Sequence, residues 1–265
     1  MSLALGAGPL AGGDPERSNF SIDGPAHRLY GHPVSQRMRA TFAGSTVFDT
    51  TAGMLLHETG LKPALYVPAA DFDDDLLEPT ERSSHCPFKG DAGYWTVKAE
   101  GREAQNAVWA YPQPNPESAW LSDYRSVYWD AMDTWLEEDE PIFGGIRDPF
   151  HRVDVLESTR RVRVLAEETV IAESERPLVL AETGLPARFY LPLEDVLVEL
   201  EPSQTSAVCP YKGTSSYRSA RVGERLIEDA GWVYEQPLEE AAGIAGRICF
   251  ADDELTLELD GAHVS

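Results

Sequence analysis

The residue types best suited to chemistry in this chain lie in a short segment that occurs twice. Residues 85–95 have the sequence HCPFKGDAGYW and residues 208–218 have VCPYKGTSSYR, so Cys, Pro, Lys, Gly and Tyr recur at identical spacing. The proline fixes its own φ directly after the cysteine, and the glycine permits backbone turns that other residues resist. We therefore predict that each segment is a stiff turn that presents a thiol, an ammonium and a phenol.

Two roles are compatible with this turn. An ammonium close to a sulfur favours the thiolate, so Lys89 beside Cys86, or Lys212 beside Cys209, would create a nucleophile. In the structural alternative, the cysteine is a small buried residue and the lysine pairs with a carboxylate that holds the turn. Because two of the four lysines in the chain occupy this one position, the position itself matters as well as the charge.

Further groups recur together with the turn and could complete a ligand site. The tripeptide Glu-Thr-Gly at 58–60 returns at 182–184, and Trp-x-Tyr at 109–111 returns at 232–234. Residues two apart on a strand share a face, so each Trp and Tyr would form an aromatic wall beside the polar groups, as in many ligand pockets. The alternative is a core tryptophan beside a buried Glu–Lys pair. The predicted ligand-binding residues are Lys89, Tyr94, Trp109, Tyr111, Glu182, Cys209, Lys212, Tyr217, Trp232 and Tyr234.

Histidine distinguishes the two copies, because His57 and His85 correspond to Ala181 and Val208. Only the first copy therefore contains a possible set of thiol, imidazole and carboxylate. Neighbours on a strand point to opposite faces, so we expect His57 rather than His85 to partner Cys86. No pair of ligands has a standard zinc spacing, and neither a metal nor a cofactor is predicted. The candidate catalytic residues are Cys86, Lys89, His57 and Glu58.

The repetition extends well beyond these motifs. HETGLKPALYVP aligns with AETGLPARFYLP, and LEPTERSSHCPFKG with LEPSQTSAVCPYKG, at a shift of 123 to 124 residues. A duplication of this length predicts two homologous domains. We assign 1–36 to an N-terminal arm, 37–140 to the first repeat domain, 141–160 to a linker, and 161–265 to the second repeat domain with a short C-terminal tail.

Alternating apolar residues predict a mainly β fold. Val162, Val164 and Ala166 would share one face of a strand, and further strands are expected at 54–58 and 94–99 with their counterparts in the second copy. No long amphipathic helix is apparent. We predict two small bent-sheet or open-barrel domains in tandem, which pack on each other and so cover their open edges.

The bulk composition narrows the possible partners. The formal charge is −23, from 22 basic and 45 acidic residues, which disfavours binding to nucleic acid. No apolar run approaches the ~20 residues of a membrane helix, so no membrane partner is predicted. Three cysteines without a close pair give no disulfide framework, and we expect a cytoplasmic protein.

The repeated motifs ETGL, CPFKG or CPYKG, and VWAYPQP or GWVYEQP resemble those of the domain of unknown function 427 family. The resemblance extends over nearly all of 37–261. It implies a bent-sheet domain of the β-tent type in a cytoplasmic bacterial protein, without an established activity. The family is sometimes filed under a nucleotidyltransferase-like name. Gly44-Ser45 lacks the paired carboxylates that such metal-dependent chemistry requires about ten residues later, so we do not expect that activity.

Three functional hypotheses remain. The first is that a small anionic or carbonyl-containing molecule binds in a pocket formed by the CP[FY]KG turn and an aromatic strand of each repeat. The second is a non-catalytic structural or protein-interaction module, and the third is a thiol-dependent enzyme that uses Cys86. Phosphate loops, nucleophile elbows, HExxH and GxGxxG motifs are all missing from the sequence, so whether the protein is an enzyme stays open.

Overall fold

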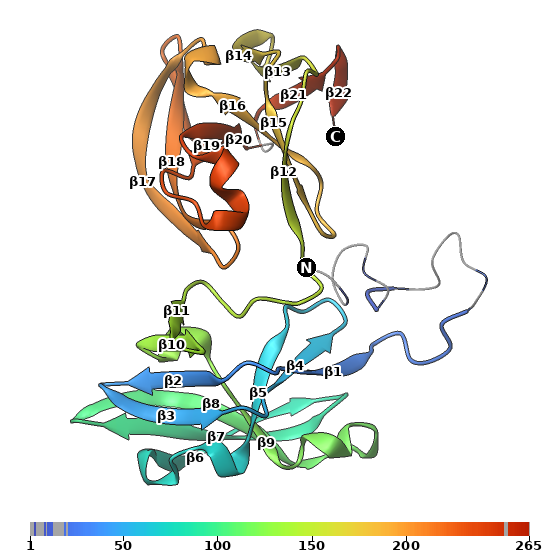
Figure 1. Cartoon of the computed structure of the whole chain (residues 1–265), viewed down its shortest axis with the longest axis vertical. Helices are drawn as coiled ribbons and strands as arrows, with labels where there is room; N and C mark the ends of the chain where they lie inside the picture. Colours follow the sequence, from blue (N-terminus) through green and yellow to red (C-terminus); the bar gives the residue numbers. More distant parts are fainter. Residues whose placement is uncertain are drawn as a thin grey trace. The chain divides into compact units, whose positions relative to one another are not determined.

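The computed structural model describes residues 21–251 and 254–264, together with a few positions before residue 20 (3, 8, 10–12 and 19). It divides into two compact units, Met1–Asp148 and Pro149–Ser265. Each unit contains one seven-stranded and one four-stranded sheet, and neither sheet closes into a barrel (Figure 1). The prediction of two mainly β domains in tandem is confirmed.

The first unit builds both sheets from antiparallel pairs. In spatial order, its larger sheet consists of β1 (Leu29–Pro33), β4 (Met54–Glu58), β5 (Ala64–Pro68), β9 (Tyr124–Val127), β8 (Arg102–Pro114), β7 (Gly90–Ala99) and β6 (Leu77–Cys86). Its smaller sheet consists of β11 (Glu140–Ile142), β10 (Thr134–Glu137), β2 (Met38–Phe42) and β3 (Ser45–Thr50).

The second unit repeats the larger sheet in the same spatial order. This sheet consists of β12 (Val153–Glu157), β15 (Leu178–Glu182), β16 (Arg188–Pro192), β20 (Arg247–Phe250), β19 (Arg225–Val233), β18 (Gly213–Val222) and β17 (Glu199–Cys209). The smaller sheet consists of β14 (Thr169–Ser174), β13 (Val162–Ala166), β21 (Thr256–Leu259) and β22 (Ala262–Val264). Figure 1 shows β17 and β18 as long, curved neighbours, in agreement with a bent sheet.

The helices are short 3-10 segments at the ends of strands. They span Ala69–Asp71, Asp74–Leu76, Pro116–Leu121, Trp129–Ala131, Leu193–Asp195 and Glu239–Ile244. Within the described part of the chain, none of the helices has the length and apolar character needed to span a membrane.

The segments that we assigned to an arm and a linker each contain a strand. Strand β1 lies within 1–36 and pairs with β4, and β12 lies within 141–160 and pairs with β15. Much of the predicted arm lies outside the described residues. These edge strands are equivalent in the two units, although their sequences, LYGHP and VDVLE, have little in common. Backbone pairing at a sheet edge tolerates this divergence, because it does not depend on side-chain identity.

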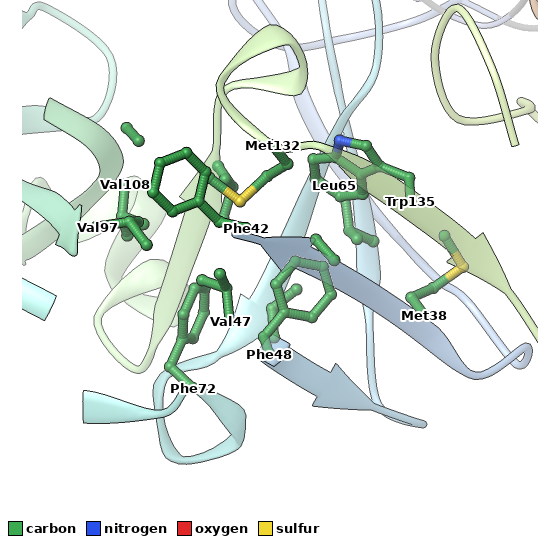
Figure 2. Packing of buried hydrophobic residues seen from close by; sticks show 14 of the residues in the cluster. Met38, Phe42, Val47, Phe48, Leu65, Phe72, Val97, Val108, Met132 and Trp135 are labelled. Carbon is green, nitrogen blue, oxygen red and sulfur yellow. The ribbon is translucent and has the colours of Figure 1, made fainter. Parts of the chain in front are cut away.

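The core of the first unit lies between its two sheets and is rich in aromatic side chains. Phe42, Phe48 and Trp135 are each at most 4% exposed, and Figure 2 shows Trp135 beside Leu65. The Trp135 ring packs 5.6 Å from that of Phe48, measured between centroids. Alternation along β2 directs Met38 and Phe42 into this core, as the burial pattern of that strand shows.

The equivalent core of the second unit differs in residue size at several positions. In the first unit, Phe48 and Trp135 lie on the two strands beside β2, and both pair with Ala40 in the middle of that strand. In the second unit Ala172 and Leu257 pair with the middle of β13. The alternation predicted for β13 is confirmed, because Val162, Val164 and Ala166 are all buried. Other positions of this core carry larger residues in the second unit, since Phe189 and Phe250 stand where the first unit has Leu65 and Val127.

We predict that Gly231→Ala lowers the stability of the second unit. A Cβ at this position of β19 would lie 2.6 Å from the carbonyl oxygen of Cys249, so the neighbouring strand would have to move. The expected loss is about 1–3 kcal/mol in urea unfolding. The control is Gly93→Ala in β7, where the nearest atom is 3.8 Å away and the second repeat already carries Ser216; here we expect less than about 0.5 kcal/mol. Equal losses would contradict the steric explanation.

Candidate functional site

The CP[FY]KG segment forms the tight connection of a hairpin in both units. Cys86 ends β6 and pairs with Gly90 at the start of β7, and Cys209 pairs with Gly213 in the same way. The two glycines have φ values of +101° and +91°, in the region that L side chains rarely adopt. The predicted stiff turn is therefore present twice, and its glycine is required by the backbone.

The lysine of each turn forms an ion pair with a glutamate on a distant strand. Lys89 donates a hydrogen bond to Glu58 at the end of β4, and Lys212 donates one to Glu182 at the end of β15. None of these four side chains is more than 13% exposed. The lysine–carboxylate pair of the structural alternative is present in both copies, but Cys86 and Cys209 are half-buried and not the fully buried residues which that alternative required.

Sequence reasoning missed a histidine that completes each cluster. The Nε2 atom of His27 lies 2.9 Å from Glu58 Oε1, and that of His151 lies 3.0 Å from Glu182 Oε1. The His27 ring also stacks on Phe88 of the turn at a centroid distance of 3.6 Å. A His-Arg dipeptide occurs at 27–28 and again at 151–152, at the same shift of 124 residues as ETGL. This signal fell outside the repeat boundaries that we predicted.

The charge of Glu182 is stabilised by its two partners. Burial raises the pKa of this carboxyl, but hydrogen bonds from His151 and Lys212 outweigh burial and lower the pKa from 4.5 to about 2. Glu182 is thus ionised at neutral pH, and so is suited to anchoring Lys212 but not to accepting a proton from a substrate.

The predicted aromatic wall lies on one face of the larger sheet. In the first unit, Trp109 packs on Tyr128 with ring centroids 4.5 Å apart. In the second, Trp232 donates a hydrogen bond to the hydroxyl of Tyr190 at 3.1 Å and packs 5.9 Å from the ring of Tyr217. Tyr94 and Tyr111 are buried in the equivalent cluster of the first unit.

In the second unit, this face contains a cavity of about 220 Å³. Five of the predicted ligand-binding residues line it, namely Glu182, Lys212, Tyr217, Trp232 and Tyr234. Arg188 lines it too, with its guanidinium 5.7 Å from the centroid of the Trp232 ring. Cys209 is not part of the lining.

One exchange of residues distinguishes the aromatic faces of the two units. The amides of Tyr128 and Ala251 make equivalent hydrogen bonds, to the carbonyl groups of Ala107 and Ala230. The Tyr128 ring that covers Trp109 thus has only a methyl group as its counterpart in the second unit. Ala64 and Arg188 are likewise equivalent, since they begin β5 and β16. Where the first unit has Ala64 and Tyr128, the second unit therefore has Arg188 and Ala251.

The candidate catalytic residues of the first unit are not gathered at one point. His57 is fully buried, and its Nδ1 lies 3.8 Å from Asp148 Oδ2, whereas the next residue, Glu58, pairs with Lys89. Burial lowers the pKa of His57, although Asp148 acts in the opposite sense. His85 is exposed and lies 2.7 Å from Asp91. Lys89 is engaged by Glu58, so the arrangement does not favour the predicted use of Lys89 to activate Cys86.

No cluster of three or more His, Cys, Asp and Glu side chains suited to holding a metal ion occurs among residues 21–251 and 254–264 or the few described positions before them. The histidine, glutamate and lysine of each turn cluster instead satisfy one another, with the glutamate as the acceptor of both donors.

We predict that Lys89→Met and Lys212→Met each destabilise their own unit by about 3–5 kcal/mol, because the buried glutamate loses the lysine and keeps only the histidine as a hydrogen-bond donor. Urea unfolding measures the loss. Lys98→Met is the control, since Lys98 pairs with Glu78 and Glu103 at the surface, and here the expected change is below about 1 kcal/mol. Similar losses at all three lysines would show that burial of the pairs is unimportant.

The low pKa of Glu182 predicts an acid-dependent contribution to stability. Because the folded pKa of about 2 lies below the ordinary value of 4.5, this contribution is complete above about pH 4.5 and is lost as the pH falls toward 2. The difference in unfolding free energy between the wild type and Glu182→Gln should therefore shrink over this range. Urea unfolding at pH 6, 4.5, 3.5 and 3 tests this, and a difference independent of pH would refute it.

Comparison with known proteins agrees with the duplicated architecture. A search of curated proteins gives no match to the chain. The family model described as Domain of unknown function (DUF427) matches residues 31–138 and 154–261. The two matches begin within β1 and β12, and each contains one CP[FY]KG turn and the glutamate to which it is anchored. The chain therefore belongs to the DUF427 family, of which it contains two copies in tandem.

Proposed function

We propose that this protein binds a small anionic or carbonyl-containing molecule in the cavity beside the CPYKG turn of the second repeat. The observation that carries the proposal is the pair of cationic side chains, Lys212 and Arg188, that line this cavity beside Trp232. A few polar groups on a largely aromatic lining are typical of small-molecule sites. The proposal concerns binding and includes no catalytic step.

Electrostatics favour an anion over a cation. The cavity contains one carboxylate, Glu182, whose two oxygens already accept hydrogen bonds from Lys212 and His151. Arg188 adds a further positive charge beside the Trp232 ring. A guanidinium offers paired donors that match carboxylate and phosphate groups.

Hydroxyl groups of the lining provide further donors. Burial raises the pKa of both Tyr190 and Tyr234, so their hydroxyl groups stay protonated at neutral pH. The hydroxyl oxygen of Tyr190 accepts a hydrogen bond from Trp232, so the hydroxyl hydrogen of Tyr190 can be donated to an acceptor on the ligand. Carbonyl or anionic oxygen atoms are the acceptors that suit these donors.

A structural role is the second candidate, and it applies to the first repeat. There Tyr128 covers Trp109, and the hydroxyl of Tyr94 is hydrogen-bonded to Ser84 at 2.7 Å. In the second repeat, Ala251 and Ala207 take the places of Tyr128 and Ser84. The aromatic face of the first repeat is therefore covered by side chains of its own, as expected for a module whose task is structural.

The binding proposal predicts stabilisation by ligand that depends on Arg188. A thermal-shift screen with small carboxylates, phosphates and carbonyl compounds should yield a compound that adds about 2.7 kcal/mol of stability at a hundred times its Kd. Arg188→Ala, which installs the residue of the first repeat, should abolish this gain and leave the fold intact.

Arg176→Ala is the control, because Arg176 is an exposed arginine of the same unit that pairs with Glu194 and Asp195. It should retain the full response. A screen in which no compound stabilises the wild type, or in which Arg188→Ala responds as the wild type does, would count against the proposal.

A further inference from the structure

The hydroxyl group of one tyrosine has a different environment in each repeat. In the first repeat, the hydroxyl of Tyr94 is hydrogen-bonded to Ser84 at 2.7 Å. Tyr217 is the equivalent tyrosine, at the same spacing from the cysteine of its turn, and it lines the cavity of the second unit. Ala207 stands in the place of Ser84, so Tyr217 lacks this partner.

No other residue within the described part of the chain replaces the missing hydrogen bond. The Tyr217 side chain is half-buried and packs 5.9 Å from the Trp232 ring, measured between centroids, and its backbone carbonyl accepts a hydrogen bond from Arg218. Its hydroxyl makes no hydrogen bond to the residues that the structure describes. A phenol can both donate and accept a hydrogen bond, so this hydroxyl is available to a molecule that enters the cavity.

Tyr190 offers a second hydrogen-bond donor in the same cavity. Its hydroxyl oxygen accepts the hydrogen bond from Trp232 at 3.1 Å, so its hydroxyl hydrogen is left for another acceptor. A carbonyl or carboxylate oxygen has two lone pairs and can accept from both phenols. These donors do not require Lys212 to leave Glu182, with which its ammonium is paired.

The rest of the lining suits a flat ring. The aromatic side chains of the lining are those of Tyr190, Tyr217, Trp232 and Tyr234. Aromatic rings attract one another more strongly than the buried area alone predicts. An engineered cavity of about 150 Å³ binds benzene. The 220 Å³ of this cavity therefore accommodates one six-membered ring with a small substituent.

We infer that the ligand of the second repeat is a single aromatic ring with a carbonyl or carboxylate group attached to it, and that an oxygen of this group accepts a hydrogen bond from Tyr217. The ring would lie among the aromatic side chains of the lining, and Tyr190 would donate to the same group. This inference rests on the proposed function and specifies the class of ligand. It includes no reaction.

Calorimetric titration of the full chain with two pairs of compounds tests the inference. Benzoate is compared with cyclohexanecarboxylate, and acetophenone with cyclohexyl methyl ketone, so that each pair differs only in the ring. The aromatic member should bind roughly threefold to tenfold more tightly than its cyclohexyl analogue, because aromatic contacts add to the effect of buried area. The pair with the higher affinity shows whether the ligand is charged.

The same substitution in the two repeats separates binding from structure. Tyr217→Phe removes only the hydroxyl and should weaken binding of the aromatic compound roughly fivefold to tenfold. It should leave the urea midpoint of the second unit unchanged, because the hydroxyl makes no hydrogen bond to the described residues. Tyr94→Phe breaks the hydrogen bond to Ser84 and should lower the urea midpoint of the first unit.

A third variant restores the partner that the first repeat provides. Ala207→Ser should engage the hydroxyl of Tyr217 and reduce the affinity for the aromatic compound about fivefold. Val208→Ser is the control, since Val208 is the next residue of β17, is 52% exposed and is not part of the lining. Neighbours on a strand point to opposite faces, so this variant should bind as the wild type does.

The possible outcomes separate the two proposals. Tighter binding of the aromatic compounds that depends on Tyr217 supports both. If the members of each pair bind equally and depend on Tyr217, the proposed site stands and the assignment of an aromatic ring is overturned. If Tyr217→Phe binds every compound as the wild type does, the inference fails. If neither these compounds nor the wider screen yields a ligand, both proposals fall.

Discussion

The buried ion pair between the turn lysine and the strand-end glutamate is the constraint on which each domain depends. Burial of either charge alone would cost several kcal/mol, so Lys89 and Glu58 must meet when the domain folds. The pair fixes the tip of the long β6–β7 hairpin against the end of β4, which lies at the opposite side of the larger sheet. His27 adds a second donor to the same carboxylate and so joins β1 and the segment before it to the turn.

Because this anchor fixes the backbone, the aromatic face beside it is free to change. Both repeats retain the lysine, the glutamate and the histidine, and both keep a tryptophan on the second strand after the turn, β8 or β19. They differ in what lies on that tryptophan: a tyrosine that follows β9 in the first repeat, and in the second an arginine from β16, which is separated from the tryptophan strand by β20. The two repeats thus differ at the aromatic face and not in the anchor, and the proposed function rests on this difference.

Much of the architecture was predictable, since period-two alternation and the internal repeat are local properties of the sequence. The grouping of Glu182, Lys212, Tyr217 and Trp232 was also foreseen, because residues that recur together in both copies are constrained together. The histidines were missed because similarity between the copies fades toward β1 and β12, where pairing is mostly through the backbone. Arg188 could not be identified as a site residue, since its importance follows from its cross-strand relation to Ala251, which requires the register of β16 and β20.

The strong negative charge of the chain limits how an anionic ligand can be held. At physiological ionic strength, charges beyond about 8 Å are largely screened, so the acidic surface neither excludes nor attracts the ligand over long distances. Selectivity for the ligand must therefore come from protein groups in direct contact with it, where the low dielectric of a half-buried cavity strengthens each interaction. Lys212 and Arg188, which line the cavity of the second unit beside Trp232, are the groups placed to make such contacts with the proposed ligand.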